Sequence, residues 1–317
     1  MKVYFWGTRG SLPVSGTAKQ VRAKVAAAVK AAAQCRFRSD EEVERFIDEK
    51  LPFAVRGGYG GNTACVEIRG GDEYILCDAG TGLRDFGNHI MRSGGGGPAV
   101  YHIFLSHLHW DHIQGFPFFV PAFVPGNRIN IYGLHPALET ALCSQQSSPS
   151  FPVPLDYMQA ERSFILLEPD REYQIGGFTV KAVKQNHPGD SYGYSFAKAG
   201  KKIVYATDSE HKEDVWGDEQ SVMTFFRDAD LLIFDAQYSF IESADTKASW
   251  GHSSNILGVE LSVAAQVKRL CLFHNEPACD DQALDIVLEN TRNYLKIHAE
   301  DSPLQIDLAY DGLEIEL

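Results

Sequence analysis

Short runs of apolar and β-branched residues recur along the chain, and each run ends in polar or glycine-rich sequence. These runs lie at 3–6, 64–68, 74–77, 100–105, 179–183, 203–206, 231–234 and 270–273. Runs of four to eight such residues with polar boundaries predict buried strands. Because they occur in both halves of the chain, we expect two β-sheets covered by helices.

The segment at about 17–52 departs from this strand pattern. Its first half is rich in alanine and lysine, which favour helices, and Ser39 is a helix N-cap residue with Glu42 at the capping-box position. Pro52 ends the second helical pattern. We therefore expect a helical hairpin inserted into a single domain spanning 1–317. The basic first half could offer positive charge to a substrate, although a solvated helix face is the simpler explanation.

A second unusual segment lies at about 135–170. It is rich in proline, serine and aromatic residues and has few basic ones. This composition favours a lid over a small pocket or a contact with another subunit. The chain has 317 residues, of which 44% are hydrophobic, so it can bury a substantial core without a linker between domains.

The stretch LSHLHWDHIQG, at 105–115, places three histidines and one aspartate within six positions. Only 11 histidines occur in the whole chain, so a solvated loop is a poor explanation of this cluster. His107 and His109 are two positions apart, and in extended chain such side chains point to the same side. Asp111 and His112 follow on a turn toward a helix, from which they could reach a second cation.

Further candidate ligands follow later strand-like runs. His187, Asp208 and His274 each come at the end of such a run. Imidazole nitrogens and carboxylate oxygens are ligands of zinc, manganese and iron(II), whereas magnesium and calcium prefer oxygen throughout. Residues at the tips of strands on a rigid sheet edge can converge on one site. The sequence thus predicts a metal centre built from distant segments.

The pattern H-x-H-x-D-H, followed by separated His, Asp and His residues, resembles the metallo-β-lactamase superfamily of hydrolases. The stretches GGNTACVEI (60–68) and YILCDAGTGL (74–83) resemble the strands and the aspartate-containing turn that precede the histidine motif in that superfamily. The resemblance covers nearly the whole chain. It implies a four-layer αββα sandwich of two mixed β-sheets flanked by helices.

The resemblance also implies a role for each matching residue. The ligands of one metal match His107, His109 and His187. The ligands of the second metal match Asp111, His112 and His274. Asp208 matches the carboxylate that bridges the two metals, and Asp78 matches an aspartate that orients a ligand. Since no ligand position is missing, we expect two divalent metal ions, with zinc as the first choice and manganese or iron as alternatives.

The stretch SWGHSSN, at 249–255, narrows the choice of reaction. His252 within it resembles the extra histidine of the ribonuclease Z and phosphonate-operon phosphodiesterase branch, which lies near the leaving group of a phosphodiester. A lone histidine before a helix is otherwise usually a cap or a surface residue. The catalytic candidates are therefore His252, Asp111 and Asp208, while Asn62 and Tyr59 in the glycine-rich turn could line the pocket.

The resemblance and the residues together imply a metal-dependent phosphodiesterase. Two cations about 4 Å apart lower the pKa of a shared water toward about 7, giving a hydroxide that attacks phosphorus. The formal net charge of −13 disfavours a broad nucleic-acid footprint. We therefore expect a small nucleotide phosphodiester as substrate, with a cyclic mononucleotide as the first candidate. The alternatives are a ribonuclease Z-like endonuclease that processes RNA 3′ ends and a catalytically idle, metal-bound nucleotide sensor.

The remaining sequence features bear on location and partners. The chain has six cysteines, none in a C-x-x-C pair, and its first residues do not form a signal peptide. No apolar stretch approaches the roughly 20 residues of a membrane span. These features favour a cytoplasmic protein. The family resemblance further implies a homodimer.

Overall fold

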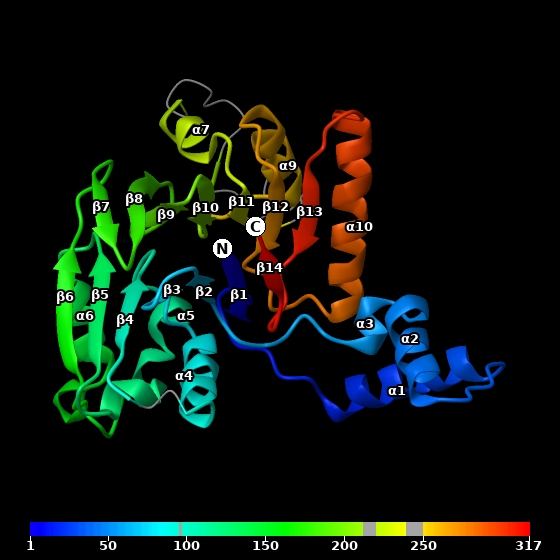
Figure 1. Cartoon of the computed structure of the whole chain (residues 1–317), viewed down its shortest axis with the longest axis horizontal. Coiled ribbons are helices and arrows are strands. Elements are labelled where there is room, and N and C mark those ends of the chain that lie inside the picture. Colours follow the sequence, from blue (N-terminus) through cyan, green and yellow to red (C-terminus); the bar gives the residue numbers. More distant parts are fainter. Residues whose placement is uncertain (95–96, 212–219, 239–249) are drawn as a thin grey trace.

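Two seven-stranded β-sheets pack against each other, and helices cover their outer faces (Figure 1). The computed structural model describes residues 1–94, 97–211, 220–238 and 250–317, so Ser249 of the SWGHSSN stretch lies outside the described residues. This arrangement confirms the predicted αββα sandwich. Among the described residues, no helix is both long and apolar enough to cross a membrane.

The first sheet has the strand order β14-β1-β2-β3-β4-β5-β6. Its members are β1 (Lys2–Gly7), β2 (Cys65–Arg69), β3 (Tyr74–Cys77), β4 (Val100–Phe104), β5 (Arg128–Gly133), β6 (Glu161–Leu166) and β14 (Glu314–Glu316). Strands β3 to β6 run parallel to one another, and the pairs of β1 with β14 and β2 are antiparallel. The sheet is therefore mixed, as expected.

The second sheet has the strand order β13-β12-β11-β10-β9-β8-β7. Its members are β7 (Glu172–Ile175), β8 (Phe178–Gln185), β9 (Ser191–Lys198), β10 (Lys201–Ala206), β11 (Leu231–Asp235), β12 (Arg269–Phe273) and β13 (Gln305–Leu308). Strands β10 to β13 are parallel. Because β8 and β10 both pair antiparallel with β9, they run in the same direction. The carboxyl ends of β8, β10, β11 and β12 thus lie at one end of this sheet.

Three hydrophobic layers hold the sandwich together. The central layer lies between the sheets and joins residues such as Phe5 and Ile75 to Phe178 and Ile233. A second layer lies under α9 (Asn255–Ala264) and α10 (Asp281–His298), and a third lies under α4 (Gly82–Arg92) and α6 (Leu138–Gln145). All five residues of β11 are buried, because this strand is covered on both faces.

The segment at 17–52 contains two helices, α1 (Ala18–Ala32) and α2 (Asp40–Lys50), and the short α3 (Phe53–Arg56) follows it. Ser39 caps α2 by accepting a hydrogen bond from the backbone of Glu42, as predicted. The carboxylate of Glu42, however, accepts from the backbone of Arg38. The complete capping box lies instead at the start of α1, between Thr17 and Gln20.

The segment at 135–170 divides into regular structure and loop. It contains α6 and, at its far end, strand β6, which pairs with β5 at the edge of the first sheet. Residues 146–160 between them include only the short 3₁₀ helix Leu155–Tyr157. A lid or subunit contact stays a prediction for this loop. All six cysteines are free, and Cys65, Cys77 and Cys271 are buried in strands β2, β3 and β12.

Candidate metal centre

Polar residues that follow strands of both sheets converge on one site. His107 and His109 follow β4 of the first sheet, and α5 (Trp110–Ile113) continues the same segment. His187, Asp208 and His274 follow β8, β10 and β12 of the second sheet. The structure therefore brings together all seven residues that the sequence singled out as candidate ligands.

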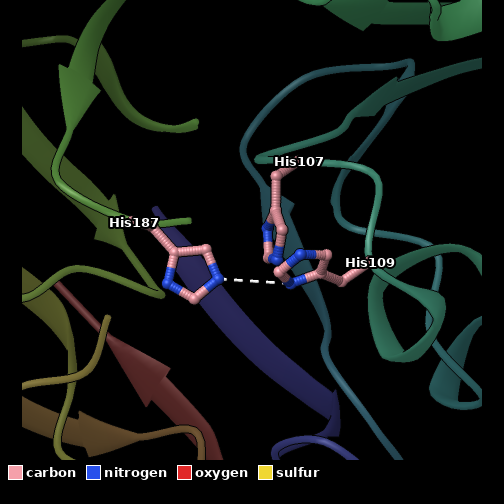
Figure 2. A group of neighbouring side chains, drawn as sticks. All are labelled: His107, His109 and His187. Atoms are coloured by element: carbon pink, nitrogen blue, oxygen red, sulfur yellow. Dashed lines mark hydrogen bonds between the residues drawn. The ribbon is translucent and has the colours of Figure 1, made fainter. Parts of the chain in front are cut away.

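The first group consists of His107, His109 and His187, whose rings point toward one another (Figure 2). Nε2 of His187 lies 3.2 Å from Nδ1 of His109. The ring centroids of His107 and His109 are 4.4 Å apart. Nε2 of His107 is buried without a hydrogen-bond partner, which is costly unless another group satisfies it.

The second group consists of Asp111, His112 and His274, and all three are buried. Oδ2 of Asp111 lies 3.2 Å from Nε2 of His112 and 3.2 Å from Nε2 of His274. The two Nε2 atoms are 3.3 Å apart. Adjacent ligands of a tetrahedral ion with bonds of about 2.1 Å are about 3.4 Å apart. The spacing of this group fits a metal ion.

Asp208 lies between the two groups and contacts both. Its Oδ1 is 3.2 Å from Nε2 of His112 and 3.4 Å from Nε2 of His274. Its Oδ2 is 3.6 Å from Nε2 of His107 and 3.8 Å from Nε2 of His187. One carboxylate thus offers a different oxygen to each group, which is the geometry of a bridging ligand.

Hydrogen bonds on the outer side of the site fix how the histidines face inward. Nδ1 of His112 donates to Asp78, that of His187 to the carbonyl of Gly251, and that of His274 to Oε1 of Gln237. A carbonyl or carboxylate oxygen can only accept, so the ring nitrogen must donate. In a neutral ring, Nε2 then carries a lone pair that faces the site. Outer partners of this kind orient metal-binding histidines.

Asp78 is fully buried and anchors this outer layer. Besides His112, its carboxylate accepts hydrogen bonds from the backbone and side chain of Ser106 and from the hydroxyl of Tyr205. The hydroxyl of Ser106 also lies 3.0 Å from Nδ1 of His107. Asp78 therefore orients one histidine directly and reaches a second through Ser106.

The backbone is strained at three residues of the site. Asp78, Asp208 and His274 have φ angles of 61°, 43° and 61°, in the left-handed region that residues other than glycine rarely adopt. Such conformations cost of order 1–3 kcal/mol each and concentrate at functional sites. Each of these residues directly follows a buried strand, β3, β10 or β12, which holds it at the site.

The local charges favour metal-binding protonation states in the first group and at Asp208, but not at His112. Burial opposes the charged form of His112, yet Asp208, Asp111 and Asp78 raise its pKa well above the usual value, so this ring must lose a proton when a metal ion binds. Burial lowers the pKa of His107 well below its usual value and also lowers the pKa of His109 and His187. These rings are therefore neutral near pH 7 and have a nitrogen lone pair to offer. Burial opposes ionisation of Asp208, but the neighbouring His112, His274 and His107 hold its pKa well below the usual range. Neutral imidazoles and ionised carboxylates form a donor set suited to zinc, manganese or iron.

His252 adjoins both groups. Its Nδ1 is 2.9 Å from Oδ2 of Asp235, and its ring stacks on that of His274 with centroids 5.0 Å apart. Its ring centroid is 5.1 Å from that of His187. Burial opposes the charged form, but Asp235 and Asp208 raise the pKa of His252 to about 9. At neutral pH, His252 is therefore a cation with protons to donate.

The sequence reasoning missed Asp235 and Gln237. Asp235 ends β11, and its carboxylate also accepts from the backbone of Ser209 and Gln237. The signal was available, because an apolar run ending in an acidic residue is the same pattern that singled out Asp208. Gln237 accepts a hydrogen bond from His274, but no sequence motif indicates that a glutamine here would orient a histidine.

The structure corrects the expectation that Tyr59 lines the pocket, while the same role for Asn62 stays a prediction. Tyr59 is only 2% exposed, packs against Phe53, and donates its hydroxyl hydrogen to Asp285 of α10. The side-chain amide of Asn62 donates to Asp85 of α4. The glycine-rich turn acts indirectly. The carbonyl of Asn62 accepts from the backbone amides of Thr8 and Arg9, and Ser11, two residues after Arg9, donates its own amide to Asp111.

Residues 73–275 match the family model described as beta-lactamase superfamily domain, which covers more than half of the chain. The chain therefore belongs to this family of the metallo-β-lactamase fold. Members of the fold carry divalent metal ions, and the His and Asp groups described above could hold them.

Several known proteins are similar to this chain. Ribonuclease Z from Thermoplasma acidophilum is 26% identical in an alignment that covers 72% of this chain and 84% of the relative. A diphosphatase from the PhnP family has a similar structure, with a TM-score of 0.61 at 18% identity over 100% of this chain and 97% of its own. The short form of human tRNase Z has a TM-score of 0.56 at 22% identity, over 100% of this chain and 99% of its own.

His211, near the site, should make the fold sensitive to mild acid. Its ring stacks on Phe234 and lies 3.1 Å from the hydroxyl of Ser209, and burial lowers its pKa to about 4. The folded pKa lies below the unfolded value of about 6.5, so protonation favours unfolding. The stability that the folded protein gains while His211 is neutral is therefore fully present above pH 6.5 and is lost as the pH falls through 4.

The substitution His211→Gln removes this titration. Thermal melts between pH 7 and 4 should show a smaller loss of stability in this variant than in the native protein, by up to about 3 kcal/mol. Parallel pH profiles for the two proteins would show that His211 does not contribute to the acid sensitivity.

Proposed function

We propose that the protein is a dinuclear, divalent-metal-dependent phosphodiesterase. In this proposal, His107, His109 and His187 hold one ion, Asp111, His112 and His274 hold the other, and Asp208 bridges them. The observation that carries the assignment is the pair of oxygens of Asp208, one turned toward each group. The buried, unpartnered Nε2 of His107 supports it independently.

The catalytic roles follow from the position of each side chain. Two bound divalent cations supply charge that stabilises phosphate oxygens and lowers the pKa of water at the site. Asp208 and Asp111 provide the negative charge that holds these cations, and Ser11 and the histidines limit the positions their carboxylates can take. The outer hydrogen bonds keep the donors fixed, so little reorganisation is needed when a phosphodiester binds.

His252 is proposed as the acid that protonates the leaving alkoxide. Asp235 holds its Nδ1 and keeps the ring charged, so a proton is available at neutral pH. Stacking on His274 places the ring next to one of the proposed metal ligands. General acids in such positions contribute about 10²- to 10⁴-fold to the rate. Asp235 is a positioning residue in this scheme.

Two exposed tryptophans support a nucleotide as substrate. Trp110, between His109 and Asp111, is 80% exposed, and Trp250, two residues before His252, is 60% exposed. Large exposed aromatic side chains beside a site offer surfaces on which a base can stack. The net charge of −13 argues against a long nucleic-acid track, so we propose a small nucleotide, with a cyclic mononucleotide first among the candidates.

The substitution Trp110→Ala tests base stacking. The ratio of kcat/KM for a cyclic nucleotide to that for methyl p-nitrophenyl phosphate should fall about 5- to 150-fold, mainly through a higher KM for the nucleotide, since stacking contributes about 1–3 kcal/mol per base. Phe118→Ala, a change at another exposed aromatic residue, is the matched control and should leave the ratio unchanged. An unchanged ratio in the Trp110 variant would remove Trp110 from substrate recognition.

A ribonuclease Z-like activity on RNA 3′ ends is the second candidate, and the similarity to ribonuclease Z of Thermoplasma acidophilum favours it. A panel of chromogenic phosphodiesters, cyclic nucleotides and precursor transfer RNA separates the two proposals. Each substrate is tested with zinc, with manganese and after chelation. Turnover of cyclic nucleotides without cleavage of the precursor supports the first proposal, and the reverse supports the second.

A further inference from the structure

The loop at 9–11, which follows β1, lies against two members of the second group, Asp111 and His274. The backbone amide of Ser11 donates to Oδ2 of Asp111 at 2.8 Å. A Cβ atom added to Gly10 would lie 2.4 Å from Nδ1 of His274, so the backbone approaches this ring more closely than a residue with a side chain could. The loop therefore limits the positions of both side chains from outside the site.

A closed chain of contacts connects this loop with the same two side chains. Nδ1 of His274 donates to Oε1 of Gln237, and Nε2 of Gln237 donates to Oγ of Ser11 at 3.3 Å. Ser11 donates its amide to Asp111, whose Oδ2 lies 3.2 Å from Nε2 of His274. Asp111 and His274 are thus held relative to each other, although they follow strands of different sheets.

The buried side chain of Arg9 anchors the loop. It is 3% exposed, and its guanidinium donates to the carbonyls of Gly60, Glu276 and Cys279. The planar guanidinium fixes the directions of these bonds. The backbone adds two more bonds, because Gly10 donates to the carbonyl of Asn275 and Asn275 donates to that of Thr8. Since Asn275 directly follows His274, the loop is joined to the segment that carries this candidate ligand.

The first group has different outer supports. His187 donates to the carbonyl of Gly251, and Nδ1 of His107 lies 3.0 Å from the hydroxyl of Ser106. Within the part of the chain that the structure describes, no hydrogen bond joins the loop at 9–11 to the first group. The loop therefore acts on one of the two groups only.

We propose that the loop at 9–11 and Gln237 are positioning elements that set the affinity of the second metal site and leave the first site unaffected. This inference rests on the proposed dinuclear centre. Outer contacts hold metal ligands in their binding positions, and their loss commonly lowers metal affinity by about 10- to 100-fold. A protein without this support should bind one ion with native affinity and the other weakly.

The substitutions Gly10→Ala and Gly16→Ala form a matched test. The new Cβ of Gly10→Ala would displace the ring of His274, whereas a Cβ at Gly16 meets nothing within 4 Å. Neither glycine has a left-handed φ angle, so alanine suits both backbones. Metal-stripped protein is titrated with zinc against a chromophoric chelator. Native protein and Gly16→Ala should bind two ions per chain with equal affinities in the two proteins, while Gly10→Ala should bind one of them about 10- to 100-fold more weakly.

The substitution Gln237→Leu tests the same support without crowding the site. It removes the bonds of Gln237 to His274 and Ser11, so it should weaken the same ion. Gln145→Leu is the matched control, because Gln145 donates to the carbonyl of Ile113 beside the site. Circular dichroism checks that each variant is folded. Anomalous scattering from crystals of Gly10→Ala grown with one equivalent of zinc should place the ion among His107, His109 and His187.

The outcomes separate this inference from the proposed function. Two ions of native affinity in both Gly10→Ala and Gln237→Leu would overturn the inference and leave the dinuclear centre intact. Equal weakening of both ions in the folded variants would also overturn it, because the effect would not be selective. Native protein that binds no zinc would overturn the proposed function and this inference with it.

Discussion

Replacing Asp208 with alanine is expected to abolish metal binding and activity together. Its two oxygens face the two histidine groups at 3.2 to 3.8 Å, so the substitution removes a proposed ligand from both ions at once. It also removes one of the two carboxylates, Asp208 and Asp111, that lie beside the Nε2 atoms of His112 and His274. Phosphodiesterase activity should fall by more than about 1,000-fold, because charge stabilisation by the ions is lost.

The metal content of the purified protein checks this prediction separately from activity. Inductively coupled plasma mass spectrometry should find fewer than one ion per chain in Asp208→Ala and about two in the native protein. Native protein stripped with a chelator is the control, since zinc or manganese should restore its activity but not that of the variant. A variant that keeps two ions per chain would show that Asp208 does not bridge them.

Replacing His252 with glutamine is expected to spare the metal ions and slow the reaction by about 10²- to 10⁴-fold. Nδ1 of His252 is committed to Asp235, so its loss should not open the coordination sphere. The missing function is the proton donated to the leaving group. The loss in kcat should therefore depend on that group, being large for a ribose alkoxide and small for p-nitrophenolate, which leaves without protonation.

Replacing the positioning residue Asp235 gives a second test of acid catalysis by His252. Asp235→Asn should reproduce part of the loss seen in His252→Gln, with the same dependence on the leaving group and with two ions still bound. Equal losses for both leaving groups would argue against acid catalysis by His252. Loss of metal in either variant would place the residue among the ligands instead.

The strands that form continuous apolar runs could be predicted from sequence, whereas β5, β9 and the strands β6, β7, β13 and β14 at the sheet edges could not. Strands β4, β10, β11 and β12 are buried along nearly their whole length and therefore appear as continuous apolar runs. Edge strands are partly exposed, and their sequences mix polar and apolar residues. Strands β6 and β7 contain no fully buried residue, and β14 has only three residues. Only their pairing with neighbouring strands reveals them.

The ligand candidates could be predicted for the same reason, because each follows a buried strand. The groups that orient them could not all be found this way. His187 donates a hydrogen bond to the backbone carbonyl of Gly251. Because every residue has a backbone carbonyl, the sequence does not indicate which one will orient the histidine. Gln237 reaches His274 from a loop, and only the three-dimensional structure brings the two side chains together. Tyr59 was predicted to line the pocket because it lies in a glycine-rich turn, but its side chain is buried and its hydroxyl donates a hydrogen bond to Asp285. The sequence does not reveal that internal partner.

The most direct test of the proposed dinuclear centre is anomalous X-ray scattering from crystals of the protein purified with zinc and measured at the zinc edge. We expect two peaks per chain, one on each side of the Asp208 carboxylate. The first should lie among His107, His109 and His187, and the second among Asp111, His112 and His274. A map with no peak at this site, or with a single peak that contacts only one of the two groups, would contradict it.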